Sequence, residues 1–332
     1  MTQHVTQELE RKIKLGQQKI VGKTFLHTAP HHDDILLGYF PYALRNLAGN
    51  TNHVLYITSG ANGVSDAYLA KHLSISQKDL ELLDSATKQE LKYGIRESES
   101  ARKWQQVAGD RVHIKNLRAG FYDLSVEALA KLEAFGALAQ KAEARKSLKS
   151  DDWCSSEKTY KRADQGYDQI LESDIQRIVD YLYVVQPDIV TVLVDPVGIG
   201  PATHHRSQQV IMQALARYHS PKPIEIIGYR NVWSSFSLQD TDMIIPVTQN
   251  ELNQMESVFQ DCFATQTSIL IFCEQDLELK NFAQQVTQIQ KAQLQQVMQL
   301  LGEKKMPPIS ADYKTEMTGA IFLQKFTLPT KR

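Results

Sequence analysis

Apolar and polar positions alternate along this chain in a pattern typical of an α/β fold. Apolar-rich stretches of strand length lie at 24–29, 54–58 and 189–194, and a further strand is expected near 112–117. The stretch at 189–194 is continuous enough for a strand buried on both faces. Between the first two runs, apolar residues recur at helical spacing over 35–44. Strands and helices in this order predict parallel strand pairs joined by right-handed crossovers. We therefore expect a three-layer, Rossmann-like, mostly parallel sheet flanked by helices.

Apolar residues at helical spacing also predict helices outside this first unit. We expect them at 7–20, 95–107, 170–185, after Arg206 as far as Tyr218, and at 284–299. The helix over 35–44 is expected to end near Gly49 and Asn50, which are typical of a helix end.

The same pattern suggests how the chain is divided. Residues 1–21 are interpreted as an N-terminal helical extension, and residues 22–330 as a single α/β domain. An Ala-, Lys- and Glu-rich stretch at about 128–169 carries no strong strand pattern. We interpret that stretch as an insertion made of a helix and exposed loop.

Composition and charge argue against several classes of protein. Apolar residues make up 42% of the chain, and the formal net charge is −1, so there is no general positive field for nucleic acid or anionic lipid. The polar N-terminus lacks the apolar core of a secretory signal, and no run of about 18 apolar residues predicts a membrane span. The three cysteines form no CxxC pair, which favours a reducing compartment. We expect a cytoplasmic protein with a small-molecule partner.

Four polar residues, His31-His32-Asp33-Asp34, follow directly on the first predicted strand. Imidazole nitrogen and carboxylate oxygen suit Zn²⁺, and catalytic zinc sites use three protein ligands and leave one position open for water. His31 and Asp34 can converge on one ion, which would leave Asp33 as a general base. The alternative is that Asp33 and Asp34 cap the next helix through its free N–H groups.

A second pair of histidines, His204 and His205, lies after the predicted strand at 189–194. Open parallel sheets bring the loops at the carboxyl ends of their strands to one edge, so this pair can supply the third metal ligand. The alternative is two solvent-exposed histidines at the start of a helix.

The residues of these two clusters resemble the motifs of a known family. Pro30 to Asp34, followed by Leu37-Gly38, is similar to the PHPDD signature of the LmbE-like, or PIG-L, family of zinc-dependent N-acetylglucosaminyl deacetylases. The similarity continues in the same order through 56–60, 95–99 and 195–205, and covers about residues 22–230. The resemblance implies an LmbE-like deacetylase fold and a Zn²⁺ cofactor, for which Fe²⁺ or another divalent ion can substitute.

The resemblance also implies roles for the residues of both clusters. It makes His31 and Asp34 metal ligands and Asp33 the catalytic base, with a late histidine completing the site. The family loop carries two histidines spaced HxxH, whereas this chain has adjacent histidines. Alignment on the Gly-Pro-Ala-Thr run favours His204 as the third ligand, and alignment on His-Arg favours His205. We take His204 as the ligand and His205 as a catalytic residue that stabilises the oxyanion.

Other departures and candidates concern the surroundings of the site. Ala202 occupies the earlier histidine position of the family loop, and Ile35 replaces the glutamate that usually follows the aspartates. The resemblance makes Arg96 and Asp123 substrate-binding residues. For Arg96 the alternative is an exposed salt-bridged helix face with Glu99, and for Asp123 it is a turn-capping carboxylate.

Two aromatic residues are further candidates for contact with the substrate. Tyr229 and Trp233 could form a stacking wall for a sugar ring, and their alternative is a place in the hydrophobic core.

Together these observations predict a metal-dependent amidohydrolase. It would remove acetate from an N-acetylglucosamine-type sugar or sugar conjugate by means of metal-activated water, with Asp33 as general base. Its partner would be the amino sugar, without nucleic acid or membrane, and a homo-oligomer is compatible with this prediction. Two alternatives stay open: a non-catalytic sugar or sugar-phosphate binding module related to glucosamine-phosphate metabolism, and a metal hydrolase of a different amide.

Overall fold

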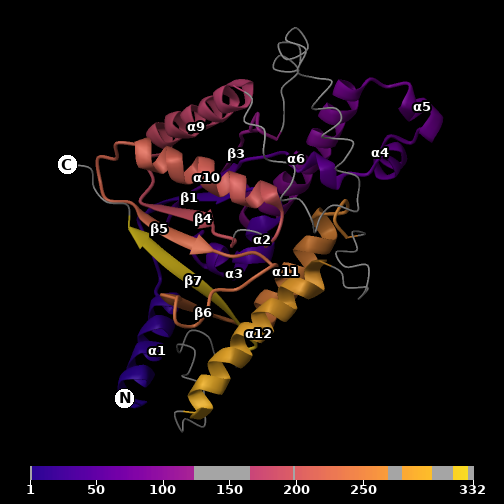
Figure 1. Ribbon diagram of the computed structural model, residues 1–332. Coiled ribbons are helices and arrows are strands. Elements are labelled where there is room, and N and C mark those ends of the chain that lie inside the picture. Colours follow the sequence, from indigo (N-terminus) through magenta and orange to yellow (C-terminus); the bar gives the residue numbers. More distant parts are fainter. Residues whose placement is uncertain (1, 123–164, 197–198, 268–278, 301–316, 328–332) are drawn as a thin grey trace.

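The computed structural model describes residues 2–122, 165–196, 199–267, 279–300 and 317–327. Among these residues, seven strands form one mixed sheet with helices on both faces (Figure 1). The strands are β1 (Thr24–Ala29), β2 (Thr51–Tyr56), β3 (Val112–Asn116), β4 (Ile189–Leu193), β5 (Glu225–Tyr229), β6 (Met243–Val247) and β7 (Gly319–Thr327). Their order across the sheet is β3-β2-β1-β4-β5-β7-β6.

The first five strands in this order are parallel, and β7 runs antiparallel to both of its neighbours. The predicted α/β class with a mostly parallel sheet is therefore confirmed. β1 occupies the predicted residues, whereas β2 begins and ends earlier than the predicted strand at 54–58. Because β1, β4 and β5 are adjacent and parallel, the loops that follow them meet at one edge of the sheet.

Helices connect the strands within the described residues. They are α1 (Thr2–Gln17), α2 (Asp34–Gly38), α3 (Phe40–Arg45), α4 (Asp66–Leu73), α5 (Gln77–Glu81), α6 (Ser85–Ala108), α9 (Gln165–Val185), α10 (Ala202–Arg217), α11 (Gln249–Cys262) and α12 (Leu279–Leu300). Two short 3₁₀ helices lie at Ala61–Gly63 and Gly109–Arg111. None of the helices within the described ranges is both long and apolar enough to span a membrane.

Alternate residues of the strands face opposite layers. Phe25 and Val54 pack in one core cluster with side chains of α2, α3, α6 and α11. Their neighbours Leu26 and Leu55 pack in a second cluster with side chains of α9 and α10. This period-two alternation places a helical layer on each face of the sheet, as Figure 1 shows.

The predicted single helix over 35–44 is wrong, because the chain forms α2 and α3 with a break at Tyr39 (φ −152°, ψ 28°). Pro41 at the start of α3 cannot donate a helical hydrogen bond, which favours a new helix there. Gly38 ends α2 against β5, and a Cβ on it would lie only 2.7 Å from the Tyr229 ring. The close packing of α2 against β5 therefore depends on a residue without a side chain at position 38.

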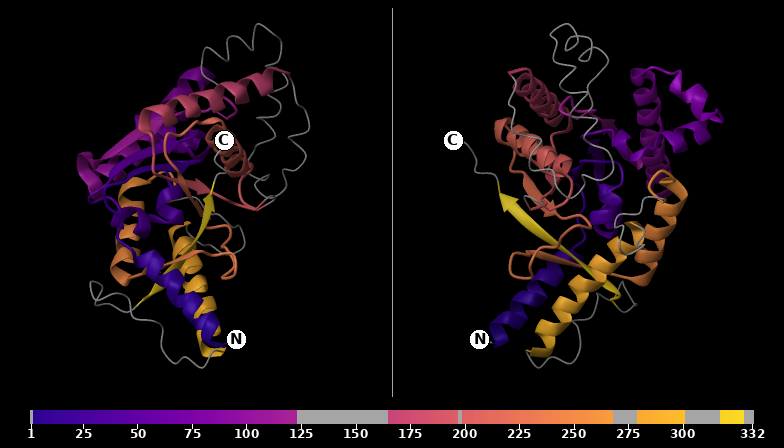
Figure 2. Two further views of the ribbon diagram at one scale, coloured as in Figure 1. Left: turned by 90° about the vertical axis from the view of Figure 1, so that its left-hand side faces the viewer. Right: turned by 45° about the vertical axis from the view of Figure 1, so that its right-hand side comes forward.

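The N-terminal helix α1 begins and ends earlier than the predicted helix at 7–20. Leu9 and Ile13 are buried against Ile244 of β6 and against Leu294 and Met298 of α12. Figure 2 shows α1 and α12 side by side at one end of the sheet. The division into a helical extension and one domain stays a prediction. The predicted insertion at about 128–169 lies outside the described residues up to residue 164, and α9 begins at Gln165.

Candidate metal centre

The loops after β1 and β4 bring the predicted metal-site residues together. His31 and Asp34 follow β1, and His204 lies in the first turn of α10, which follows β4. One ligand atom from each of these three residues lies within 4.8 Å of the other two. We call His31, Asp34 and His204 the His/Asp cluster.

The short distances within the His/Asp cluster involve both oxygens of Asp34, one facing each histidine. His204 Nε2 lies 3.3 Å from His31 Nδ1 and 3.5 Å from Asp34 Oδ1, and His31 Nδ1 lies 3.4 Å from Asp34 Oδ2. A tetrahedral Zn²⁺ with bonds of about 2.0–2.1 Å separates its ligand atoms by roughly 3.3–3.4 Å. The three residues therefore fit a divalent ion in type and number, with one ligand atom of each within 4.8 Å of the other two, and they leave a coordination position for water or substrate.

Asp195, which follows β4, orients His204. Its Oδ2 atom lies 2.8 Å from His204 Nδ1, and both side chains are buried. An Nδ1–H that donates to this carboxylate leaves the lone pair of Nε2 directed into the His/Asp cluster. Pairing of a metal-binding histidine with a carboxylate is a common arrangement around protein metal sites.

Asp34 is buried, and hydrogen-bond donors hold both of its oxygens. Oδ2 accepts from the His31 backbone N–H at 2.6 Å, and Oδ1 accepts from the Asn231 side-chain amide. Burial alone would raise the pKa of Asp34, but attraction by His204 and His31 outweighs it and lowers the pKa to about 2. Asp34 is therefore an ionised, oriented carboxylate at neutral pH.

The pKa of His204 responds to the same charges in the opposite direction. Burial lowers the pKa of this imidazole, but Asp34 and Asp195 together raise it above its ordinary value. Two buried carboxylates thus favour positive charge at this position. A bound divalent cation would satisfy the same requirement.

The helix-capping interpretation of the aspartates is wrong within the described residues. Asp33 occupies the N-cap position of α2, but its side chain makes no capping hydrogen bond. The Asp34 carboxylate accepts from His31, which precedes the helix, rather than from an amide of α2.

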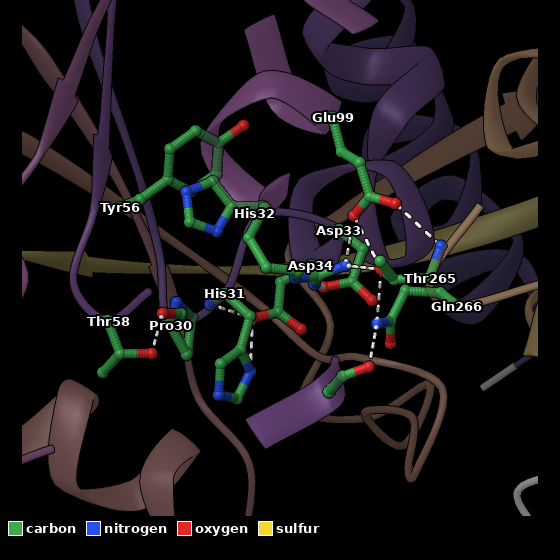
Figure 3. A network of polar contacts seen from close by, with 12 residues as sticks. Pro30, His31, His32, Asp33, Asp34, Tyr56, Thr58, Glu99, Thr265 and Gln266 are labelled. Atoms are coloured by element: carbon green, nitrogen blue, oxygen red, sulfur yellow. Dashed lines mark hydrogen bonds and ion pairs between the residues drawn. The ribbon is translucent and has the colours of Figure 1, made fainter. Parts of the chain in front are cut away.

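Asp33 lies beside the His/Asp cluster and forms an ion pair with Arg96 of α6. Its Oδ1 atom accepts from Arg96 Nη2 at 2.9 Å, and Arg96 Nη1 also donates to Glu99 Oε2 at 2.8 Å. The Thr265 hydroxyl lies 3.0 Å from the same Nη1 atom and 2.7 Å from Glu99 Oε2. Figure 3 shows Asp33 and Asp34 between His31 and the pair formed by Glu99 and Thr265.

Arg96 and Glu99 are buried, with 2% and 0% exposure, so the interpretation as an exposed helix face is wrong. The guanidinium also has one donor left over, because its buried Nε finds no hydrogen-bond partner among the described residues. That nitrogen lies 3.3 Å from where a Cβ on Gly60 would sit, and His31 Cδ2 lies 3.5 Å from the same point. A glycine with φ +62° thus keeps a small space open between Arg96 and His31.

Several predicted residues do not join the His/Asp cluster. His205 Nε2 lies 3.1 Å from Gln209 on the next turn of α10, and its buried Nδ1 has no hydrogen-bond partner in the described part of the chain. Asp123 lies outside the described residues. Tyr229 belongs to the core, since its ring is buried and its hydroxyl donates to the Thr28 carbonyl. Trp233 is partly buried against the same core.

Lys103 is a charged residue behind the site that the sequence analysis did not single out. It is fully buried and donates to the His32 carbonyl at 3.1 Å and to the Tyr56 hydroxyl at 2.8 Å. Its Nζ also lies 4.5 Å from the centre of the Trp104 ring. Burial lowers the pKa of Lys103 to about 7, although Asp33 and Asp34 act in the opposite direction.

This shift predicts a pH-dependent stability that Lys103→Met should remove. The folded-state pKa is lower than the unfolded value, so the unfolded state binds more protons between about pH 7 and 10, and stability rises with pH there. From pH 7 to 9, wild type should gain about 2 kcal/mol in free energy of unfolding relative to Lys103→Met. Urea denaturation at both pH values measures this difference, with Lys222→Met as a surface control. Identical pH dependence of wild type and Lys103→Met would contradict the prediction.

Comparison with known proteins gives structural similarity only. No protein-family model and no curated protein sequence matches the chain. The 4-carboxy-2-hydroxymuconate hydratase of Pseudomonas putida is 15% identical, with 93% of this chain and 99% of that chain covered and a TM-score of 0.47. The N,N′-diacetylchitobiose deacetylase of Pyrococcus horikoshii is 10% identical, with 97% and 92% covered and a TM-score of 0.48. A zinc-inhibited form of teicoplanin deacetylase is also 10% identical, with 92% and 99% covered and a TM-score of 0.48.

At such identities, the chemistry of this chain has to be inferred from its own residues.

Proposed function

We propose that this protein is a divalent-metal amidohydrolase of the LmbE-like type that removes acetate from an N-acetylglucosamine-type sugar or sugar conjugate. The observation that carries the proposal is the His/Asp cluster, in which one ligand atom of each residue lies within 4.8 Å of the other two. A carboxylate beside the cluster, Asp33, supplies the second component that hydrolysis needs. The sugar substrate is inferred from the similarity of residues 30–34 to the family motif.

A divalent ion held by His31, Asp34 and His204 would acidify a water molecule and polarise the amide carbonyl. Zn²⁺ suits this mixture of nitrogen and oxygen ligands, and Fe²⁺ can bind the same set. The carboxylate of Asp195 on His204 Nδ1 would strengthen the donor character of Nε2.

Asp33 is the proposed general base. It adjoins Asp34 in the chain but is not one of the three clustered residues, so its carboxylate is available for proton transfer. Asp33 would accept a proton from the attacking water and return it to the departing amine. The ion pair with Arg96 holds Oδ1 in place and so orients the carboxylate for proton transfer.

Arg96 is proposed mainly as a positioning residue for Asp33, with its free Nε as a donor toward a substrate group beside Gly60. Arg96→Lys would retain the charge but lose the forked contacts to Asp33 and Glu99. We expect kcat to fall by about 10²-fold, because small displacements of a catalytic group have effects of this size.

The measurement is steady-state kinetics at constant metal loading. Arg45→Lys is a matched control, since Arg45 makes a comparable forked pair with Glu251. An equal loss of kcat in the two variants would point to general destabilisation rather than positioning.

Acetate release tests the proposed function directly. Purified protein loaded with Zn²⁺ is incubated with N-acetylglucosamine, its phosphate and conjugate derivatives, and a panel of other amides. Release of acetate from the sugars is expected. Hydrolysis of other amides but not of the sugars would contradict the proposed sugar substrate and retain the amidohydrolase activity. Absence of hydrolysis of every amide by metal-loaded protein would overturn the proposal and favour a binding module.

A further inference from the structure

Asn231 is a buried polar residue that contacts two aspartates of the metal centre, Asp34 and Asp195. It lies in the loop after β5 and is 2% exposed. Its side-chain amide donates to Asp34 Oδ1, and its backbone N–H donates to Asp195 Oδ1 at 3.4 Å. Its Oδ1 atom accepts from the Val232 backbone N–H at 2.6 Å. A single residue therefore donates hydrogen bonds to both carboxylates.

The two carboxylates have different positions in the centre. Asp34 belongs to the His/Asp cluster, whereas Asp195 holds Nδ1 of His204 at 2.8 Å. Asp34 follows β1, Asp195 follows β4 and Asn231 follows β5, and these strands are neighbours in the sheet. Asn231 thus links the loops of three adjacent strands at the point where the ligand atoms converge.

The chemistry of this position favours an amide. The His31 N–H already occupies Asp34 Oδ2, so the Asn231 amide leaves neither oxygen of the buried carboxylate without a donor. An aspartate at 231 would place a second carboxylate against Asp34, and an apolar residue would leave Asp34 Oδ1 short of one donor. The hydrogen bond to Val232 fixes which way the amide points.

We propose that Asn231 is a positioning residue of the metal centre, which holds Asp34 and the Asp195–His204 pair in the arrangement that binds the ion. This inference rests on the metal site of the proposed function. Asn231 does not act as a ligand in this role. Its contribution is to fix the ligands before the ion arrives, so that binding needs no rearrangement of buried charges.

Metal affinity of variants at position 231 tests the inference. Asn231→Ser can keep the hydrogen bond to the Val232 amide but is too short to reach Asp34, and Asn231→Ala loses both side-chain contacts. The backbone contact to Asp195 remains in both variants. The dissociation constant for Zn²⁺ is measured by competition with a chromophoric chelator. The visible absorption of Co²⁺ bound to the full chain reports the ligand geometry. Both variants should bind about 10–100-fold more weakly than wild type, with an altered Co²⁺ spectrum.

Asn46→Ala is the matched control. Asn46 is also 2% exposed, and its amide donates to the Tyr42 carbonyl rather than to the metal centre. This variant should retain the wild-type affinity and Co²⁺ spectrum, even where its melting temperature falls as much as that of Asn231→Ser. Equal weakening in Asn46→Ala would assign the effect to general destabilisation and overturn the inference.

The remaining outcomes separate the inference from the proposed function. Wild-type affinity in Asn231→Ser and Asn231→Ala, with metal still bound at the His/Asp cluster, would overturn only the role of Asn231. Failure of wild-type protein to bind Zn²⁺ or Co²⁺ would overturn the metal site and the inference together.

Discussion

Replacing Asp33 by Asn is expected to lower kcat by about 10²–10⁴-fold while the metal content stays at the wild-type level. The Asn side chain is nearly isosteric, and its carbonyl oxygen can still accept the hydrogen bond from Arg96 Nη2. It cannot accept a proton from water at neutral pH. The loss should therefore fall on turnover rather than on metal binding or folding.

Asp34→Asn is the matched control for this variant. Asp34 belongs to the His/Asp cluster, so loss of its negative charge should remove metal and activity together. Acetate release and elemental analysis on the same preparations separate the two cases. Wild-type turnover in Asp33→Asn would assign the base to another group, and loss of metal from Asp33→Asn would contradict the separation of roles.

The N-terminal part of the sheet could be predicted because its patterns are local. Residues 24–29 are an apolar-rich stretch that stops at a proline, and β1 occupies those residues. The strand over 189–194 is continuous and apolar because β4 is buried on both faces between two parallel neighbours. Burial on both faces produces a continuous apolar run, which can be recognised from the sequence alone.

The far side of the sheet was not predicted. β5, β6 and β7 are joined by pairings such as Ile226 with Phe326 and Met243 with Leu323, which connect positions far apart in the sequence. The short strands β5 and β6 carry no period that separates them from buried helix or loop. The helices α4, α5 and α11 were also missed, although the last begins with a capping box at Thr248 and Glu251 that is visible in the sequence.

The meeting of His31, Asp34 and His204 was predictable for a topological reason. Each residue follows a parallel strand, and β1 and β4 turned out to be neighbours. The supporting residues were not predicted. Asn231 follows a strand that the sequence analysis did not detect, and Thr265 lies after a helix that it also missed.

Helix geometry, rather than sequence pattern, distinguishes which of the two adjacent histidines faces the His/Asp cluster. Successive residues of an α-helix point about 100° apart, so His204 and His205 cannot both face the same ion. The structure directs His204 into the His/Asp cluster and His205 toward Gln209. The catalytic role predicted for His205 stays a prediction, and a kinetic measurement on His205→Ala tests it.

This difference predicts opposite results for two neighbouring substitutions. His204→Ala removes a ligand atom and leaves Asp195 buried without its imidazole partner, so the metal should be lost. His205→Ala removes a ring that contacts Gln209, so the metal should be retained. Both variants replace a histidine by alanine, one position apart on α10. Comparing them therefore controls for the general effect of truncating a histidine on this helix.

Elemental analysis of wild type, His31→Ala, His204→Ala and His205→Ala after identical loading with Zn²⁺ and removal of excess ion tests the metal centre most directly. We predict about one ion per chain in wild type and His205→Ala, and almost none in His31→Ala and His204→Ala. Full occupancy in His204→Ala, or loss of the ion from His205→Ala alone, would contradict the assignment of His31, Asp34 and His204 as the metal ligands.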